Sequence, residues 1–271
     1  MRLVFLFACL LRPTQFRAET VPVRYPEGVS HGYLVLRTLD GKTIADGDSA
    51  QVVRGDHVIN RMRFRFKDGS IYDETTVFSQ RGTFRLLSDH VVQKGPTFRK
   101  PMDAVIDTSR GQVTVHYAED GKEKVVNEKL DLPPDLANGI VFTLLKDLTN
   151  TGVTTVSYVA TTPKPRLVHL EITPQAEEPF TNGIYKHRAV RYTLKVKIGG
   201  AAGLVAPLVG KQPPDTQAWI VRDDAPAFVK FEGPLYGDGP IWRLELSAPN
   251  RWPQNNAAQL RGGSNRNGRA R

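Results

Sequence analysis

The sequence predicts a mainly β protein: a large curved antiparallel sheet, or an open barrel or half-barrel, with one inserted amphipathic helix. Three features indicate this architecture: strict alternation of apolar and polar residues, Asp-Gly dipeptides between the alternating runs, and a single stretch with helical spacing. Residues 61–67 alternate basic and apolar side chains. Because a strand points successive side chains to opposite faces, Met62, Phe64 and Phe66 are predicted to face a core.

The same alternation recurs in four other segments. Apolar residues hold every second position in residues 113–117, 168–172, 194–198 and 242–246. One apolar and one polar face on each strand is typical of antiparallel sheets with one side in water. We therefore expect residues 19–252 to form a single β-rich domain.

Dipeptides that favour tight turns separate these runs: Asp40-Gly41, Asp68-Gly69, Asp120-Gly121 and, less clearly, Asn182-Gly183. A two-residue turn at the second of these would place Arg63 opposite Glu74 and Phe66 opposite Ile71. In that register Phe64 meets an acidic residue, so we expect a β-bulge nearby.

The helical pattern lies near residues 134–148. Its apolar residues recur at helical spacing: Leu136, Ile140, Leu144, Leu145 and Leu148. Two prolines precede the pattern, and Asn150 and Gly152 follow it as stop signals. The predicted helix packs its leucine stripe over one surface of the sheet.

Residues 1–18 are predicted to be a signal peptide. Arg2 precedes an apolar run of nine residues, 3–11, which suits a signal h-region and is too short to span a bilayer. With cleavage after Ala18, the mature chain is exported to the periplasm or cell envelope and has no transmembrane span. A first strand or a wrongly assigned start codon are the alternatives.

Cys9 is the only cysteine of the chain. Residues 6–9 distantly match the lipobox of bacterial lipoproteins, but too few apolar residues precede Cys9 for a lipid anchor, which we do not expect. Cleavage after Ala18 would leave no cysteine, so no disulfide framework is predicted.

The net charge of +9 belongs mainly to the two ends. Residues 1–18 hold three arginines and no acid, and residues 253–271 hold four arginines and no acid. The nearly neutral body argues against nucleic acid as a partner, because such proteins need a basic footprint on the folded domain. The polar residues 253–271 are predicted to be a disordered basic tail.

No catalytic, metal or cofactor motif is convincing. Residues 28–32 match G-x-S-x-G, but a strand-like run follows Ser30 where a serine hydrolase needs a helix. The six histidines show no metal-ligand spacing, which leaves a zinc site assembled from distant histidines as an alternative. We expect no catalytic residue, no metal and no cofactor; a hydrolase that uses Ser30 is the alternative.

Two groups of residues are candidates for ligand binding. The basic residues Arg61, Arg63, Arg65, Lys195 and Lys197 on alternating strands could contact anionic head groups, or could be a solvated face. The apolar, glycine-rich segment 199–215, with Leu204, Val205 and Leu208, could be a lid over a hydrophobic cavity or a buried crossover.

The chain resembles an uncharacterised family of exported bacterial proteins in three segments: Leu132–Gly139, Gly203–Asp215 and Phe231–Pro249. More loosely, a signal peptide, a curved antiparallel sheet and an inserted helix resemble the LolA-like half-barrel lipid carriers of the cell envelope. This second resemblance implies that the concave face of the sheet holds a lipid or acyl chain, and it assigns no residue a role.

These observations lead to one functional hypothesis with two alternatives. We expect a non-enzymatic protein of the cell envelope that binds or carries an apolar or amphipathic ligand, such as a lipid, by burying its apolar surface. The alternatives are a scaffold or assembly protein that binds another envelope protein, and the Ser30 hydrolase.

Overall fold

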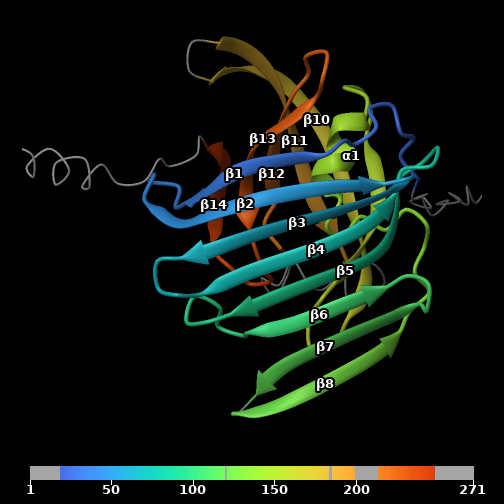
Figure 1. The fold of residues 1–271 in the computed structure, drawn as a ribbon, viewed down its shortest axis with the longest axis vertical. Helices are drawn as coiled ribbons and strands as arrows, with labels where there is room; N and C mark the ends of the chain where they lie inside the picture. The colour runs from blue at the N-terminus through green and yellow to red at the C-terminus, as the bar shows by residue number, and fades with distance from the viewer. Residues whose placement is uncertain (1–18, 120, 183–184, 199–212, 248–271) are drawn as a thin grey trace, which may run out of the picture.

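The computed structural model describes residues 19–119, 121–182, 185–198 and 213–247. These residues form one sheet of 14 antiparallel strands, which does not close into a barrel, and one helix (Figure 1). The structure thereby confirms the predicted fold class. No helix of the described residues is long and apolar enough to cross a membrane.

The first eight strands precede the helix, and the last six follow it. The first group is β1 (Ser30–Arg37), β2 (Thr43–Arg54), β3 (His57–Phe66), β4 (Ile71–Ser79), β5 (Arg85–Lys94), β6 (Met102–Asp107), β7 (Gln112–Glu119) and β8 (Lys122–Lys129). The helix is α1 (Val141–Asp147). The second group is β9 (Thr154–Ala160), β10 (Arg166–Asn182), β11 (Tyr185–Lys197), β12 (Thr216–Val221), β13 (Ala227–Pro234) and β14 (Ile241–Ser247).

Strands that are neighbours in the sheet are also neighbours in the sequence, with one exception. The order β8-β7-β6-β5-β4-β3-β2-β1-β14-β13-β12-β11-β10-β9 joins the two groups through β1 and β14. These two strands pair from Tyr33 opposite Ser247 to Arg37 opposite Arg243. The sheet edges are therefore β8 and β9, and the segment that connects them carries α1.

The main core lies on the inner face of this bent sheet, where α1 covers it (Figure 1). Leu136, Ile140, Leu144 and Leu145 are almost fully buried. They share one apolar cluster with inward side chains of β3–β7 and of β9–β12. Both halves of the sheet thus pack against the same short segment of chain, as the leucine pattern predicts.

A second, aromatic cluster is formed by residues of β1–β5, of the loop after β5, and of β13–β14 with the turn between them. Phe66, Phe98, Tyr236 and Trp242 form a chain of ring contacts with centroids 5.1–5.8 Å apart. The Tyr236 hydroxyl also donates a hydrogen bond to the carbonyl of Thr97, at 3.1 Å. These contacts fix the β13–β14 turn against the loop that follows β5.

The predicted register of β3 and β4 is wrong by one residue. Arg63 lies opposite Asp73, and Phe64 lies opposite Tyr72. The cause is the turn: Phe66 pairs with Ser70, whose carbonyl accepts a hydrogen bond from the Phe66 N–H at 2.9 Å, so three residues, 67–69, form the loop instead of two. The observed register pairs aromatic with aromatic and basic with acidic side chains. A bulge does occur in the turn itself, where Gly69, with a φ of +85°, and Ser70 both bond to Phe66.

The helix is shorter than the predicted segment 134–148. α1 has seven residues, and Gly139 just before it has a φ of +66°, which a helix interior does not allow. Residues 135–138 instead run along the edge of β9. Asp135 Oδ2 accepts a hydrogen bond from the Ser157 N–H, and Asn138 bonds both backbone groups of Val159. The β9 edge is therefore covered by the chain itself.

Candidate functional site

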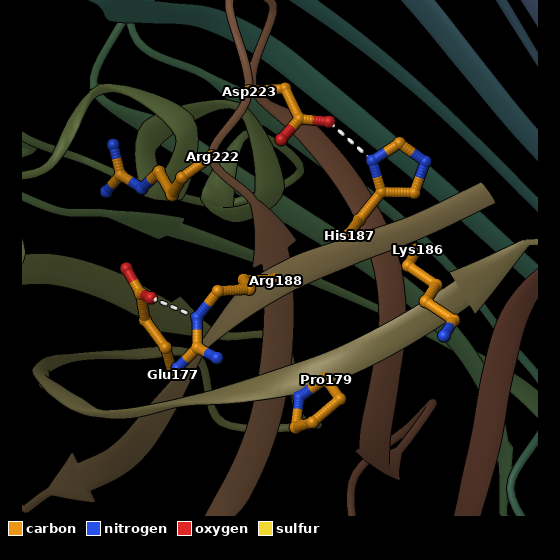
Figure 2. A pocket seen from close by; sticks show the side chains of 7 residues that line it. All are labelled: Glu177, Pro179, Lys186, His187, Arg188, Arg222 and Asp223. Carbon is orange, nitrogen blue, oxygen red and sulfur yellow. Dashed lines mark hydrogen bonds and ion pairs between the residues drawn. The ribbon is translucent and has the colours of Figure 1, made fainter.

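An open pocket lies beside the β10–β11 hairpin (Figure 2). It has a volume of about 520 Å³. Its lining comes from the two strands of the hairpin and from the end of β12: Glu177, Pro179, Lys186, His187, Arg188, Arg222 and Asp223. The long hairpin extends beyond the rest of the sheet, so its charged side chains surround a solvent-filled space instead of packing on a core.

One ion pair and one histidine–carboxylate hydrogen bond organise the lining of this hairpin pocket. Arg188 Nε lies 2.8 Å from Glu177 Oε2, and His187 Nδ1 lies 2.5 Å from Asp223 Oδ2 (Figure 2). Lys186 is exposed, and within the described part of the chain no carboxylate pairs with it. The ammonium group of Lys186 is therefore available to a bound anion.

Arg222 supports the pocket from the helix side. Its guanidinium donates to the carbonyls of Leu145, Lys146 and Leu148 at the end of α1. A fourth hydrogen bond goes to the Tyr192 hydroxyl. These bonds satisfy carbonyls that a helix end leaves free, and they place a positive charge at the negative end of the helix dipole. The Nε atom of Arg222 is buried without a hydrogen-bond partner in the structure.

The pocket lining has a formal excess of positive charge, since three cations face two carboxylates with His187 neutral. Lys186 offers three donors, and the guanidinium of Arg188 keeps donors that its single bond to Glu177 does not use. Charge-assisted hydrogen bonds from such groups bind phosphate, sulfate or carboxylate. The arrangement is suited to holding an anionic group.

A second polar cluster lies on the inner face of the sheet, between the two apolar clusters. Glu74 and Asp89 are adjacent carboxyl groups on β4 and β5, beside Thr76. Thr76 and Asp89 are only 1–2% exposed, and the Thr76 hydroxyl donates to Asp89 Oδ1 at 2.9 Å. Glu74 is half-buried and bonds the Tyr72 hydroxyl.

Burial shifts the titration of this inner cluster. Burial raises the pKa of Glu74 to about 8, and the charge of Asp89 adds to the shift. Burial also raises the pKa of Asp89, to about 6, although the bond from Thr76 opposes this change. The pKa values of Tyr72 and Tyr158 rise for the same reason, with the two carboxylates contributing. Near neutral pH the pair therefore shares about one proton.

The sequence contained a signal for this inner cluster that the predictions above did not use. Glu74 has the same parity as Tyr72, Thr76 and Phe78, so the alternation along β4 already places its carboxyl group on the core face. The hairpin pocket had no comparable signal, because its residues come from three strand segments that only the fold brings together.

The predicted basic residues lie on the outer face and form ion pairs there. Arg61 contacts Asp73 at 2.5 Å, while Arg63 and Arg65 lie 3.7 and 3.9 Å from Asp48.

On β11, Lys195 lies 3.4 Å from Asp215, and Lys197 lies 3.4 Å from Glu171. The structure does not bring the two basic groups together, because β2, β1, β14, β13 and β12 stand between β3 and β11 in the sheet. Leu204, Val205 and Leu208 lie outside the described residues, as do the predicted signal peptide and tail.

Two alternatives named above are a hydrolase that uses Ser30 and a zinc site. Ser30 is the exposed first residue of β1, and β2 follows that strand directly. No group of three or more His, Cys, Asp or Glu side chains with metal-binding geometry occurs among the residues that the structure describes.

Comparisons with protein-family models, with curated proteins and with solved structures find no match to this chain. The mainly β, antiparallel architecture is confirmed by the structure itself. The resemblance to an exported bacterial family stays a prediction.

Proposed function

We propose that this chain is a non-enzymatic, exported binding protein for an amphipathic ligand with an anionic head group, and that the head group binds in the hairpin pocket. The observation that carries the proposal is that the cationic side chains of Lys186 and Arg188 line one open pocket of about 520 Å³. A pocket of this size accommodates a phosphorylated or sulfated head group.

The packing of the core determines where the ligand is proposed to bind. The inner face is filled by the leucines of residues 136–148, so the proposal places the ligand at the hairpin and not inside the curved sheet. Pro179 contributes apolar surface to the pocket, whereas Phe180, on the opposite face of β10, packs on the cluster of Ala189, Trp219, Val221 and Val229. The apolar part of the ligand is proposed to lie along Pro179, with its charged end at Lys186.

Export is part of the same proposal, and it is supported by the pattern of residues 1–18 alone. Fusing residues 1–25 to a reporter enzyme that is active only outside the cytoplasm tests it, with Leu6→Arg as a control that interrupts the apolar run. Activity of the first fusion and loss in the second are expected; equal activity of the two would contradict export.

Vesicle flotation tests the ligand proposal. The full chain is expected to float with vesicles of phosphatidylglycerol and not with vesicles of phosphatidylcholine. Lys186→Glu is expected to weaken this binding by at least about fivefold, because one lysine near an anionic surface contributes about 1 kcal/mol. Raising the salt concentration should weaken it further.

Lys164→Glu is the matched control, because Lys164 is an exposed lysine in the turn before β10. It is expected to leave binding unchanged within about twofold, as most distant surface changes do. Equal losses in the two variants would mean that net charge, not the pocket, attracts the vesicles, and the proposed site would be wrong.

A further inference from the structure

The two edge strands of the sheet, β8 and β9, differ in what lies beside them. The β9 edge is covered by residues 135–138, whereas β8 pairs only with β7 on one side and with no described strand on the other. A free edge presents a row of unpaired N–H and C=O groups, which another strand can bind. Among the residues that the structure describes, the edge of β8 is therefore the one open to a further strand.

The sequence of β8, KEKVVNEK, is complementary to itself when read in the opposite direction. Two copies can pair antiparallel with Val126 opposite Val126 on a two-fold axis. Glu123 then lies opposite Lys129, and Lys124 lies opposite Glu128, each pair occurring twice by symmetry. Because directly opposite residues share a face of the sheet, the inner faces of the two copies lie on the same side of the joined sheet.

Neighbouring registers lose this complementarity. Centring the pairing on Val125 brings only Lys122 opposite Glu128 and leaves Glu123 opposite Asn127. Centring it on Asn127 sets Lys129 opposite Val125. Only the register on Val126 pairs four of the five charged residues of β8 with an opposite charge.

The charges of β8 are largely free to form these pairs. Lys124 contacts Glu119 on β7, but among the described residues no ion pair is formed by Glu123, Glu128 or Lys129. Val125 is 52% exposed on the outer face, so an added strand would also remove apolar surface from water.

We propose that a second copy of this chain binds at β8, with the two β8 strands antiparallel and centred on Val126. The result is one sheet that continues through a two-fold axis from copy to copy. This inference does not depend on the hairpin pocket, since β10 and β8 lie at opposite ends of the strand order.

Charge exchange tests the proposal by analytical ultracentrifugation of the full chain. Wild type is expected to dimerise reversibly. Glu123→Lys replaces two attractive pairs with two repulsive ones and should weaken the dimer about tenfold. The double variant Glu123→Lys/Lys129→Glu restores opposite charges and should return the affinity to within about threefold of wild type.

Asp40→Lys makes the same change in charge in the exposed turn after β1 and should leave dimerisation unchanged. Even a weak specific contact produces dimers at a chain concentration of about 1 mM. The proposal would be overturned if the wild-type chain stayed monomeric up to that concentration. It would also be overturned by a dimer that Glu123→Lys weakens and the double variant fails to restore.

Cysteine crosslinking tests the register in a Cys9→Ser background. Val126→Cys is expected to give a disulfide-linked dimer on oxidation, because directly opposite Cβ atoms are about 5 Å apart. Val125→Cys is the control: it lies opposite Asn127, about 7–8 Å from its own copy, and should crosslink far less. Equal crosslinking of the two variants, or none in either, would contradict this register.

Discussion

Glu74 and Asp89 are two carboxyl groups that the fold holds away from water on the inner face of the sheet. The groups that influence their ionisation are the hydroxyls of Tyr72, Thr76 and Tyr158 and, for Asp89, the adjacent His90. Ionising both carboxyl groups therefore costs free energy that folding must offset.

The first prediction concerns Glu74→Gln. The folded-state pKa of Glu74, about 8, lies above its ordinary value of 4.5, so the folded protein loses stability as pH rises through this window. Glutamine removes the ionisation. We expect the variant to gain several degrees of melting temperature at pH 9, and roughly none at pH 4, in thermal unfolding followed by circular dichroism.

Asp224→Asn serves as the control, because Asp224 is exposed in the turn after β12 and should show no pH-dependent gain. A gain for Glu74→Gln of the same size at both pH values would show that the glutamine packs better and that titration is not the cause.

The second prediction concerns Gly139, whose backbone lies against the same cluster. A Cβ atom at this position would come within 2.1 Å of Thr76 Oγ1 and 2.8 Å of Asp89 Oδ1. Gly139→Ala is expected to reduce the free energy of unfolding in urea by about 2–4 kcal/mol, from the collision and the positive φ together.

Gly152→Ala separates these two causes. Gly152 has a similar φ of +83°, but nothing lies within 4 Å of its Cβ position. It should lose only about 1 kcal/mol, the cost of the backbone conformation. Similar losses in the two variants would rule out close packing of Gly139 on the inner cluster.

At the level of whole elements, residues 135–138 lie beside β9, where a further strand of the sheet would otherwise pair. Asn138 donates to the Val159 carbonyl at 2.9 Å and accepts from the Val159 N–H at 2.8 Å. Residues 135–138 thus satisfy part of the β9 edge without a full ladder, and they bring the chain into position to begin α1 over the core.

The third prediction follows from these bonds. Asn138→Ala leaves two buried backbone groups of Val159 unpaired and should lower the free energy of unfolding by about 2–4 kcal/mol. Asn127→Ala is the comparison, because Asn127 also accepts hydrogen bonds but is exposed on β8, where water replaces them. Urea denaturation of the two variants measures the difference; equal losses would contradict it.

Elements were predictable to different degrees from the sequence. Alternation placed Phe64 and Phe66 correctly in the core, because parity does not depend on how long a turn is. The register of β3 and β4 does depend on it, and Asp68-Gly69 fits a three-residue loop as well as a two-residue turn. Leu136 and Ile140 were rightly expected to be buried, yet leucine spacing could not reveal that Gly139 interrupts the helix.

The candidate site was less predictable than the fold, for a physical reason. Lys186, Arg222 and Asp223 read as ordinary polar residues at strand ends, and only the packing of β12 beside β11 brings them together. Residues 135–138 of the segment Leu132–Gly139 are buried, so this segment is informative about packing and not about a ligand.

For the molecule as a whole, the pairing of β1 with β14 joins the two groups of strands. Leu36 and Leu244 meet there, and each is 1% exposed. Every other strand pair joins sequence neighbours, so this contact has by far the largest sequence separation of the strand pairs. Contacts of this kind form late and slow the folding reaction.

The fourth prediction is therefore a truncation. A chain that stops after Gly239 lacks β14, which exposes β1 and β13 as new edges and opens the aromatic cluster around Trp242. It should lose the cooperative thermal transition. A chain that stops after Trp252 keeps β14 and should melt within about 2 °C of the full chain, since a polar tail adds little. Cooperative melting of the shorter chain would contradict the role given to this pair.

The β1–β14 seam also means that the covalent ends of the described sheet are adjacent in space, since Tyr33 near the start of β1 lies opposite Ser247 at the end of β14. The first and last strands that the structure describes are thus neighbours in the sheet, so the ends of the described sheet lie at this strand pair. A circular permutant, with a linker bridging these ends and new termini in the exposed turn at Asp40-Gly41, would keep every strand pair of the native sheet.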